Sequence, residues 1–152
     1  MKHLFVSLCA CMLALAVPLA PAQERHTTPT AGLTVSGAWL RWVPGTQVAS
    51  AYFELRNDGK RTVAVTAVES PAAEHAMLHE SFIENGQSRM RHVEKIEIAP
   101  ARTVRLEPGG LHVMLHGLRE GIAVGQSVPL TLTLSTGENL RFTAEVRPLG
   151  AQ

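Results

Sequence analysis

From Leu33 onward, short runs of alternating apolar and polar residues are separated by turn signals built from Gly, Pro and Asn. Alternation with a period of two is typical of β-strands that bury one face. No long stretch keeps a helical period. Evenly spaced short strands indicate an all-β domain, an antiparallel sandwich or barrel, over residues 33–148. The predicted strands are Leu33–Trp42, Val48–Arg56, Thr62–Val68, Ala73–Phe82, Ser88–Ile98, Thr103–Leu106, Leu111–Leu118, Val128–Ser135 and Asn139–Val146.

Residues 1–22 follow a different pattern, that of a secretory signal peptide. Lys2 precedes an uncharged apolar run, Leu4–Leu19, which is followed by Ala20-Pro21-Ala22. The run is shorter than the ~20 residues with which a helix spans a bilayer, and small residues mark the cleavage site. We expect cleavage after Ala22, a flexible leader over residues 23–32 and a mature chain in the periplasm. The alternative is Leu8-Cys9-Ala10-Cys11, which faintly resembles a lipoprotein cleavage box.

Charge and cysteine content narrow the classes of function. The 152-residue chain carries 14 Lys and Arg against 13 Asp and Glu. This near-balance argues against a nucleic-acid binder that works through a broad basic face. Cleavage after Ala22 would remove both cysteines, Cys9 and Cys11. Disulfides, thiolate metal sites and redox dithiols are therefore excluded from the predicted mature chain.

Histidine and methionine gather between positions 75 and 116. Imidazole and thioether without thiolate favour Cu(I) over Zn(II), Mg(II) or Ca(II). His112 and Met114 are two apart in a predicted strand, so their side chains leave the same face. The turn at Asn85-Gly86 can bring His79 and Met90 together. Two imidazoles and two thioethers would form a neutral four-ligand site, although a lone methionine is more often core filler and a lone histidine is usually a surface residue.

Four more residues of these types are candidates for an auxiliary metal site. His75 and Met77 share the face of a predicted strand with His79. One interpretation is a shell that captures Cu(II) or widens the entry path for the metal. The other is a set of ordinary solvated surface residues. Both interpretations apply to His75, Met77, His92 and His116.

The spacing of the four main candidates resembles the signature of a known family. Ten residues separate His79 from Met90, twenty-one separate Met90 from His112, and one separates His112 from Met114. This spacing is similar to the signature of periplasmic copper chaperones of the PCuAC type. Leu106 to Leu115 resembles the Leu-x-Pro-Gly-Gly-x-His-x-Met-Leu run of that family. Met90-Arg91-His92-Val93 resembles its Met-Arg-Pro-Val segment, with His92 in place of the usual proline. The resemblance extends from Leu33 to Val146.

This resemblance implies a cupredoxin-like Greek-key β-barrel that binds Cu(I) through His79, Met90, His112 and Met114. It also implies delivery of copper towards the CuA site of cytochrome c oxidase. The partners that the resemblance implies are the oxidase subunit that bears this site, a thioredoxin-like copper chaperone, or both. We expect a monomer that binds no nucleic acid and does not span a membrane.

Two other functions compete with copper delivery. A periplasmic copper buffer or resistance protein would use the same site without a dedicated oxidase partner. An enzyme is disfavoured by the residues, since the chain has neither an H-E-x-x-H motif nor a G-x-S-x-G elbow. A blue-copper redox role would need a cysteine ligand, which the predicted mature chain lacks.

Overall fold

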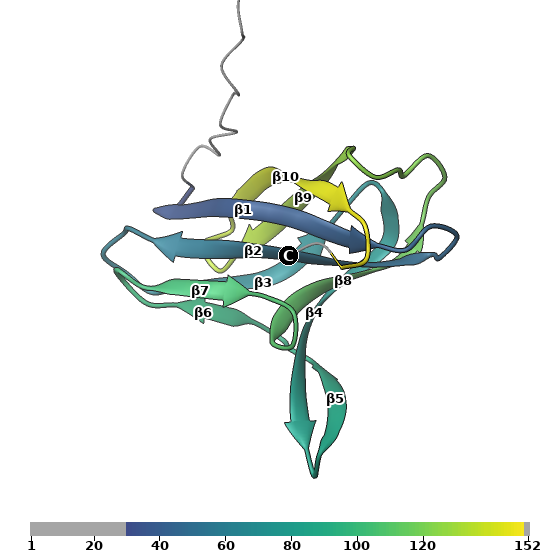
Figure 1. Cartoon of the computed structure of the whole chain (residues 1–152). Coiled ribbons are helices and arrows are strands. Elements are labelled where there is room, and N and C mark those ends of the chain that lie inside the picture. Colours follow the sequence, from purple (N-terminus) through teal and green to yellow (C-terminus); the bar gives the residue numbers. More distant parts are fainter. Residues whose placement is uncertain (1–29, 151–152) are drawn as a thin grey trace, which may run out of the picture.

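A computed structural model describes residues 30–150, which fold into ten β-strands (Figure 1). This confirms the predicted all-β class. The predicted signal peptide, its cleavage site and most of the leader lie outside the described residues. Residues 30–150 contain no helix long and apolar enough to cross a membrane. The strands are β1 (Leu33–Trp42), β2 (Val48–Asn57), β3 (Val63–Glu69), β4 (Ala73–Glu84), β5 (Gln87–His92), β6 (Ile96–Ile98), β7 (Thr103–Leu106), β8 (Leu111–Leu118), β9 (Ser127–Leu134) and β10 (Asn139–Arg147).

The strands form a single sheet that wraps around a common core (Figure 1). Their hydrogen-bonded order is β5-β4-β8-β2-β1-β10-β9-β3-β6, and β7 pairs with the second half of β2. The expected antiparallel arrangement is wrong at one seam, where β1 and β10 run parallel with Trp39 opposite Glu145. These two strands come from opposite ends of the domain, so no short hairpin constrains them to be antiparallel.

Alternation along each strand separates the core from the outer face. Val113 and Leu115 on β8 are fully buried, and Leu78 on β4 is 3% exposed. Their neighbours in the sequence point to the opposite side of the sheet, because successive strand residues alternate between the two faces. Apolar burial on one side therefore fixes which residues of β4 and β8 face outward.

The predicted strand Ser88–Ile98 is wrong, because the chain forms two strands there. β5 ends at His92 and β6 begins at Ile96, and the two lie at opposite ends of the sheet. Burial explains the break. Ile96 and Ile98 are core residues that pair with β3, whereas every residue of β5 is exposed. The remaining predicted strands agree with the structure to within two residues at each end.

The hairpin of β4 and β5 projects from the body of the domain (Figure 1). β4 pairs with β8 from Ala73 to Glu80 and with β5 from His79 to Glu84. The predicted Asn-Gly turn is confirmed at its tip, where Asn85 and Gly86 both have positive φ, 51° and 75°. His79 therefore lies where the projecting hairpin leaves the sheet, paired on both sides.

Candidate metal centre

The predicted ligands converge on one face of β5, β4 and β8. His79 lies directly opposite His112, and their ring centroids are 5.9 Å apart. Met90 lies opposite Ser81, two residues beyond His79 on β4. Directly opposite residues of an antiparallel pair share a face, as do residues two apart in one strand. All four predicted ligands, Met114 included, therefore project from the same side of the sheet.

His112 is the buried member of this group, with 4% exposure. Its Nδ1 lies 3.0 Å from the carbonyl oxygen of Gly110. A carbonyl oxygen only accepts, so Nδ1–H is the donor and Nε2 keeps its lone pair for a metal ion. The ring of Tyr52, itself 6% exposed, lies beside His112 with the centroids 6.3 Å apart. The Gly110 carbonyl thus fixes the tautomer of this imidazole, and the Tyr52 ring helps to fix its position.

The Pro-Gly-Gly turn before β8 positions His112. Gly109 has φ of 87°, a conformation that favours glycine. The Gly110 N–H donates to the Glu107 carbonyl at 3.0 Å, and the Glu107 N–H donates to the Leu111 carbonyl at 2.9 Å. The Gly110 carbonyl also accepts the Ser81 N–H at 2.9 Å. One turn therefore holds His112 and joins it to the strand that carries His79.

The imidazole of His79 has a nitrogen without a protein partner. Its Nδ1 is buried and makes no hydrogen bond. A buried polar atom left unpaired costs about 1–3 kcal/mol, and a missing ion is one explanation for such an atom. The ring of His92 lies perpendicular to the His79 ring at 5.9 Å, on the side away from His112. An ion bound here would remove the penalty of the unpaired imidazole.

Burial lowers the pKa of His79, and the nearby His112, His92 and His116 lower it further. Desolvation disfavours the charged imidazolium, and neighbouring positive charges repel it. Neutral imidazole is the form that binds a metal ion. His79 therefore remains available as a ligand at lower pH than a solvated histidine.

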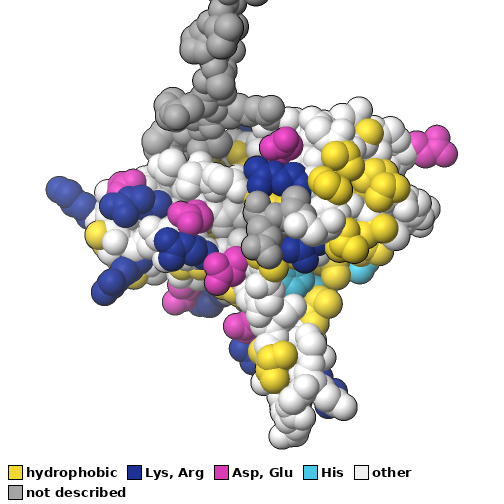
Figure 2. All heavy atoms as spheres, viewed as in Figure 1, with side chains coloured by type: hydrophobic (Ala, Val, Ile, Leu, Met, Phe, Trp, Pro, Cys, Tyr) yellow, Lys and Arg dark blue, Asp and Glu magenta, His cyan; other side chains and the backbone are white. Residues whose placement is uncertain are grey.

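The two thioethers differ in exposure. Met114 is half-buried, and its Sδ accepts a hydrogen bond from Ser50 Oγ at 3.8 Å. Met90 is 50% exposed on the projecting hairpin. Histidine side chains reach the surface where this hairpin meets the body (Figure 2). The centre thus has a fixed inner side, formed on β8, and an open outer side at Met90.

The auxiliary candidates lie on the same face. His75 is opposite His116, Met77 is opposite Met114, and His92 is opposite His79. The expectation that His75, Met77 and His79 share a face is confirmed. Within residues 30–150, no three His, Cys, Asp or Glu side chains gather as a metal site. The groupings on this face instead combine imidazoles with thioethers.

Two features of the centre were missed in the sequence. Ser50 and Tyr52 are two residues apart on β2 and contact proposed ligands on β8. Ser50 is opposite Met114, and the Tyr52 ring lies beside His112. No local motif marks them, because their role depends on the pairing of β2 with β8. The second feature is a repeated pentapeptide, His-x-Met-Leu-His, at residues 75–79 and 112–116. Comparing the two histidine-rich segments directly would have found this repeat.

Solved structures place the fold in a known class. Apo-DR1885 from Deinococcus radiodurans is 31% identical with a TM-score of 0.61, covering 93% of this chain and 97% of that one. CuI-DR1885 is 29% identical with a TM-score of 0.56, covering 80% of each chain. A copper-bound PCuAC domain from PmoF2 is 22% identical with a TM-score of 0.68, covering 81% of this chain and 98% of that domain. The protein has the cupredoxin-like fold of PCuAC domains, as predicted.

Sequence comparison gives the family. The model of the family described as "LpqE-like: Putative lipoprotein LpqE-like" matches residues 33–146. The putative lipoprotein Lxx21020 of Leifsonia xyli subsp. xyli is 32% identical over 117 residues, which are 76% of this chain and 70% of that protein. The chain therefore belongs to the LpqE-like family.

We predict that His79 titrates below the ordinary histidine pKa of about 6.5 in the metal-free protein. Between this folded-state pKa and about 6.5, the His79 imidazole binds more protons in the unfolded chain than in the folded one. The free energy of unfolding therefore falls as the pH is lowered through this window, and His79 has no such effect above about 6.5. NMR titration of the ring C–H signals measures the midpoint. His92→Gln should raise it by removing one neighbouring positive charge. A wild-type midpoint at or above 6.5 would contradict the expected downward shift.

Proposed function

We propose that this protein is a periplasmic Cu(I)-binding metallochaperone that delivers copper towards the CuA site of cytochrome c oxidase. The observation that carries the proposal is the difference in exposure across the centre. His112 is 4% exposed, whereas Met90 is 50% exposed on the projecting hairpin. A carrier needs ligands held firmly on one side and an open side where the ligands of an acceptor enter. The centre combines both properties.

The chemistry of the donors supports Cu(I) as the cargo. The imidazoles of His79 and His112 and the thioethers of Met90 and Met114 are neutral, soft or intermediate ligands that suit Cu(I) better than Cu(II). The similarity to a protein solved with Cu(I) bound supports the same choice. Thiolate binds Cu(I) more tightly than thioether does, so an acceptor with cysteine ligands can take the ion by ligand exchange.

The hairpin favours a carrier over a passive copper buffer. Ile83 lies on the face of β4 that carries His79 and is 71% exposed. Exposed apolar side chains are typical contact points for a partner protein. Ile83 and Met90 share the projecting hairpin, so an acceptor that docks there meets the open side of the centre. The oxidase subunit that bears CuA and a thioredoxin-like copper chaperone are the partners we propose, from the PCuAC resemblance.

Export of the chain is part of the proposal. We propose that residues 1–22 are a signal peptide and that the mature protein begins at Gln23. The matched family and the Leifsonia xyli relative are both described as putative lipoproteins, which supports export and keeps the cysteine pair near position 10 as the alternative.

The mass of the exported chain tests the cleavage site. Expression with its own leader in a bacterium that exports proteins should yield a chain that starts at Gln23, because small residues at Ala20 and Ala22 mark the cut. Intact-mass spectrometry of the periplasmic fraction measures this directly. A membrane-bound chain that begins at Cys9 or Cys11 and carries lipid would show that the lipoprotein alternative is correct.

Copper transfer tests delivery. The Cu(I)-loaded chain is mixed with a soluble CuA-bearing oxidase domain in its reduced, copper-free form, and the two are separated before copper is measured in each. We expect copper to move to the acceptor, because thiolates outcompete thioethers. His112→Ala serves as the control and should carry little copper to the mixing step. Copper retained by the wild-type chain would favour the buffer, and a chain that binds no Cu(I) would refute both functions.

A further inference from the structure

The paired strands β4 and β8 carry the same pentapeptide. Residues 75–79 read His-Ala-Met-Leu-His and residues 112–116 read His-Val-Met-Leu-His. The strands are antiparallel, and their register sets Met77 directly opposite Met114. An antiparallel pair has a local two-fold axis perpendicular to the sheet. Here the axis passes between the two methionines, at the centre of both repeats.

This local symmetry duplicates most of the proposed copper centre. Rotation about the axis exchanges Met114 with Met77, since these two residues are paired. The same rotation carries His112 onto the position of His75, and His79 onto that of His116. Each ligand that the first centre takes from β4 and β8 therefore has a counterpart on the same face.

We propose that His75, Met77 and His116 form a second Cu(I) site beside the first. The inference rests on the proposed function, because it assumes that the same two residue types, histidine and methionine, bind Cu(I) in the first centre. His75 and His116 are directly opposite, which sets their Cβ atoms about 4.5–5.5 Å apart. Met77 is two residues from His75, so its side chain leaves the same face.

Burial agrees with a site that copper can reach. Met77 and His116 are half-buried, and His75 is exposed. The buried faces of the same strands, at Leu78 and Leu115, are 3% and 0% exposed and hold the two strands in register. The core packing of Leu78 and Leu115 therefore fixes the strands that carry the three proposed ligands, and the ligands remain accessible to solvent.

The second site has three ligands because the fold is not symmetric beyond β4 and β8. The first centre gains Met90 from β5, which pairs with β4. On its other side, β8 pairs with β2, whose paired residues Val48 to Ala51 include no histidine or methionine. Three neutral ligands should hold Cu(I) more weakly than four. Met77 of the second site is paired with Met114 of the first, so the two sites meet at these thioethers.

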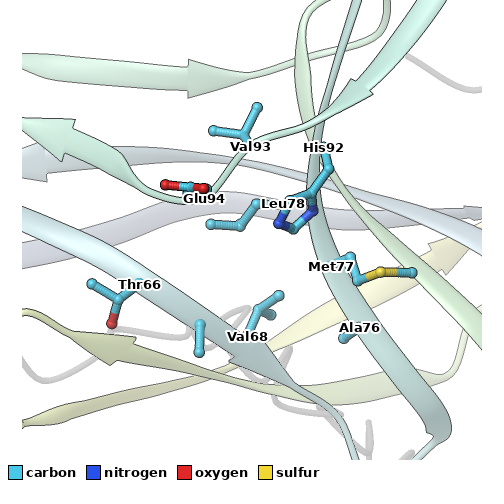
Figure 3. A pocket seen from close by; sticks show the side chains of 9 residues that line it. Thr66, Val68, Ala76, Met77, Leu78, His92, Val93 and Glu94 are labelled. Carbon is cyan, nitrogen blue, oxygen red and sulfur yellow. The ribbon is translucent and has the colours of Figure 1, made fainter.

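His92 does not belong to the second site. It lies on β5, on the opposite side of β4 from His116. His92 and Met77 line one pocket, but the His92 imidazole and the Met77 thioether point in different directions there (Figure 3). This exposed histidine is therefore a suitable matched control.

Competition of the protein with a chromogenic Cu(I) chelator measures the number and strength of the sites. The full chain is used with Cys9→Ser and Cys11→Ser, so that no thiolate binds copper. We expect two equivalents, the second held at least tenfold more weakly. Met77→Leu keeps the side-chain volume but removes the sulfur. Met77→Leu and His75→Asn should each abolish the second equivalent and leave the first within twofold, whereas His92→Asn should retain the second.

Further measurements separate failure of this inference from failure of the proposed function. In the Cys9→Ser, Cys11→Ser chain with Met77 and His75 unchanged, the Met77 ε-methyl NMR signal should shift with the second equivalent of Cu(I). Met90→Leu should weaken the first equivalent and spare the second. A single equivalent that depends on Met90 would overturn the second site alone. A second equivalent that survives both Met77→Leu and His75→Asn would also overturn it, and a chain that binds no Cu(I) would overturn both proposals.

Discussion

The register between β4 and β8 is the constraint on which the proposed metal centre depends. It sets His79 opposite His112 and Met77 opposite Met114. A shift by one residue would turn the ligands into the core and expose Leu78 and Leu115. Burial of each leucine contributes about 1.5–3 kcal/mol, so such a shift would be strongly disfavoured. The packing that holds the sheet together therefore also fixes the distance between the two imidazoles, before any metal binds.

The fold combines this fixed pair with a projecting element. His112 is enclosed by the Pro-Gly-Gly turn and by Tyr52, and its tautomer is set by Gly110. Met90 lies on exposed β5, outside the core. A ligand on an exposed hairpin has few packing contacts, and such segments open at a small cost in free energy. Rigid proposed ligands on one side and an exposed one on the other fit the proposed role, in which the protein both holds and releases an ion.

Much of this arrangement could be predicted from local sequence. The shared face of His112 and Met114 follows from their spacing in one strand, and the Asn-Gly turn follows from its residues. The split of Ser88–Ile98 into β5 and β6 could not be predicted, since local alternation does not say which edge of a sheet a strand joins. The contact of Tyr52 with His112 was missed for the same reason. Pairing between distant strands decides both, and it depends on how the whole core packs.

Copper K-edge X-ray absorption tests the central claim, that His79, Met90, His112 and Met114 bind one Cu(I) ion. The measurement uses the chain with Cys9→Ser and Cys11→Ser, loaded with less than one equivalent of Cu(I). We predict a Cu(I) edge and a shell of two sulfur and two imidazole nitrogen ligands, with one sulfur lost in Met114→Leu. A shell of nitrogen and oxygen alone, or one unchanged in that variant, would contradict this assignment.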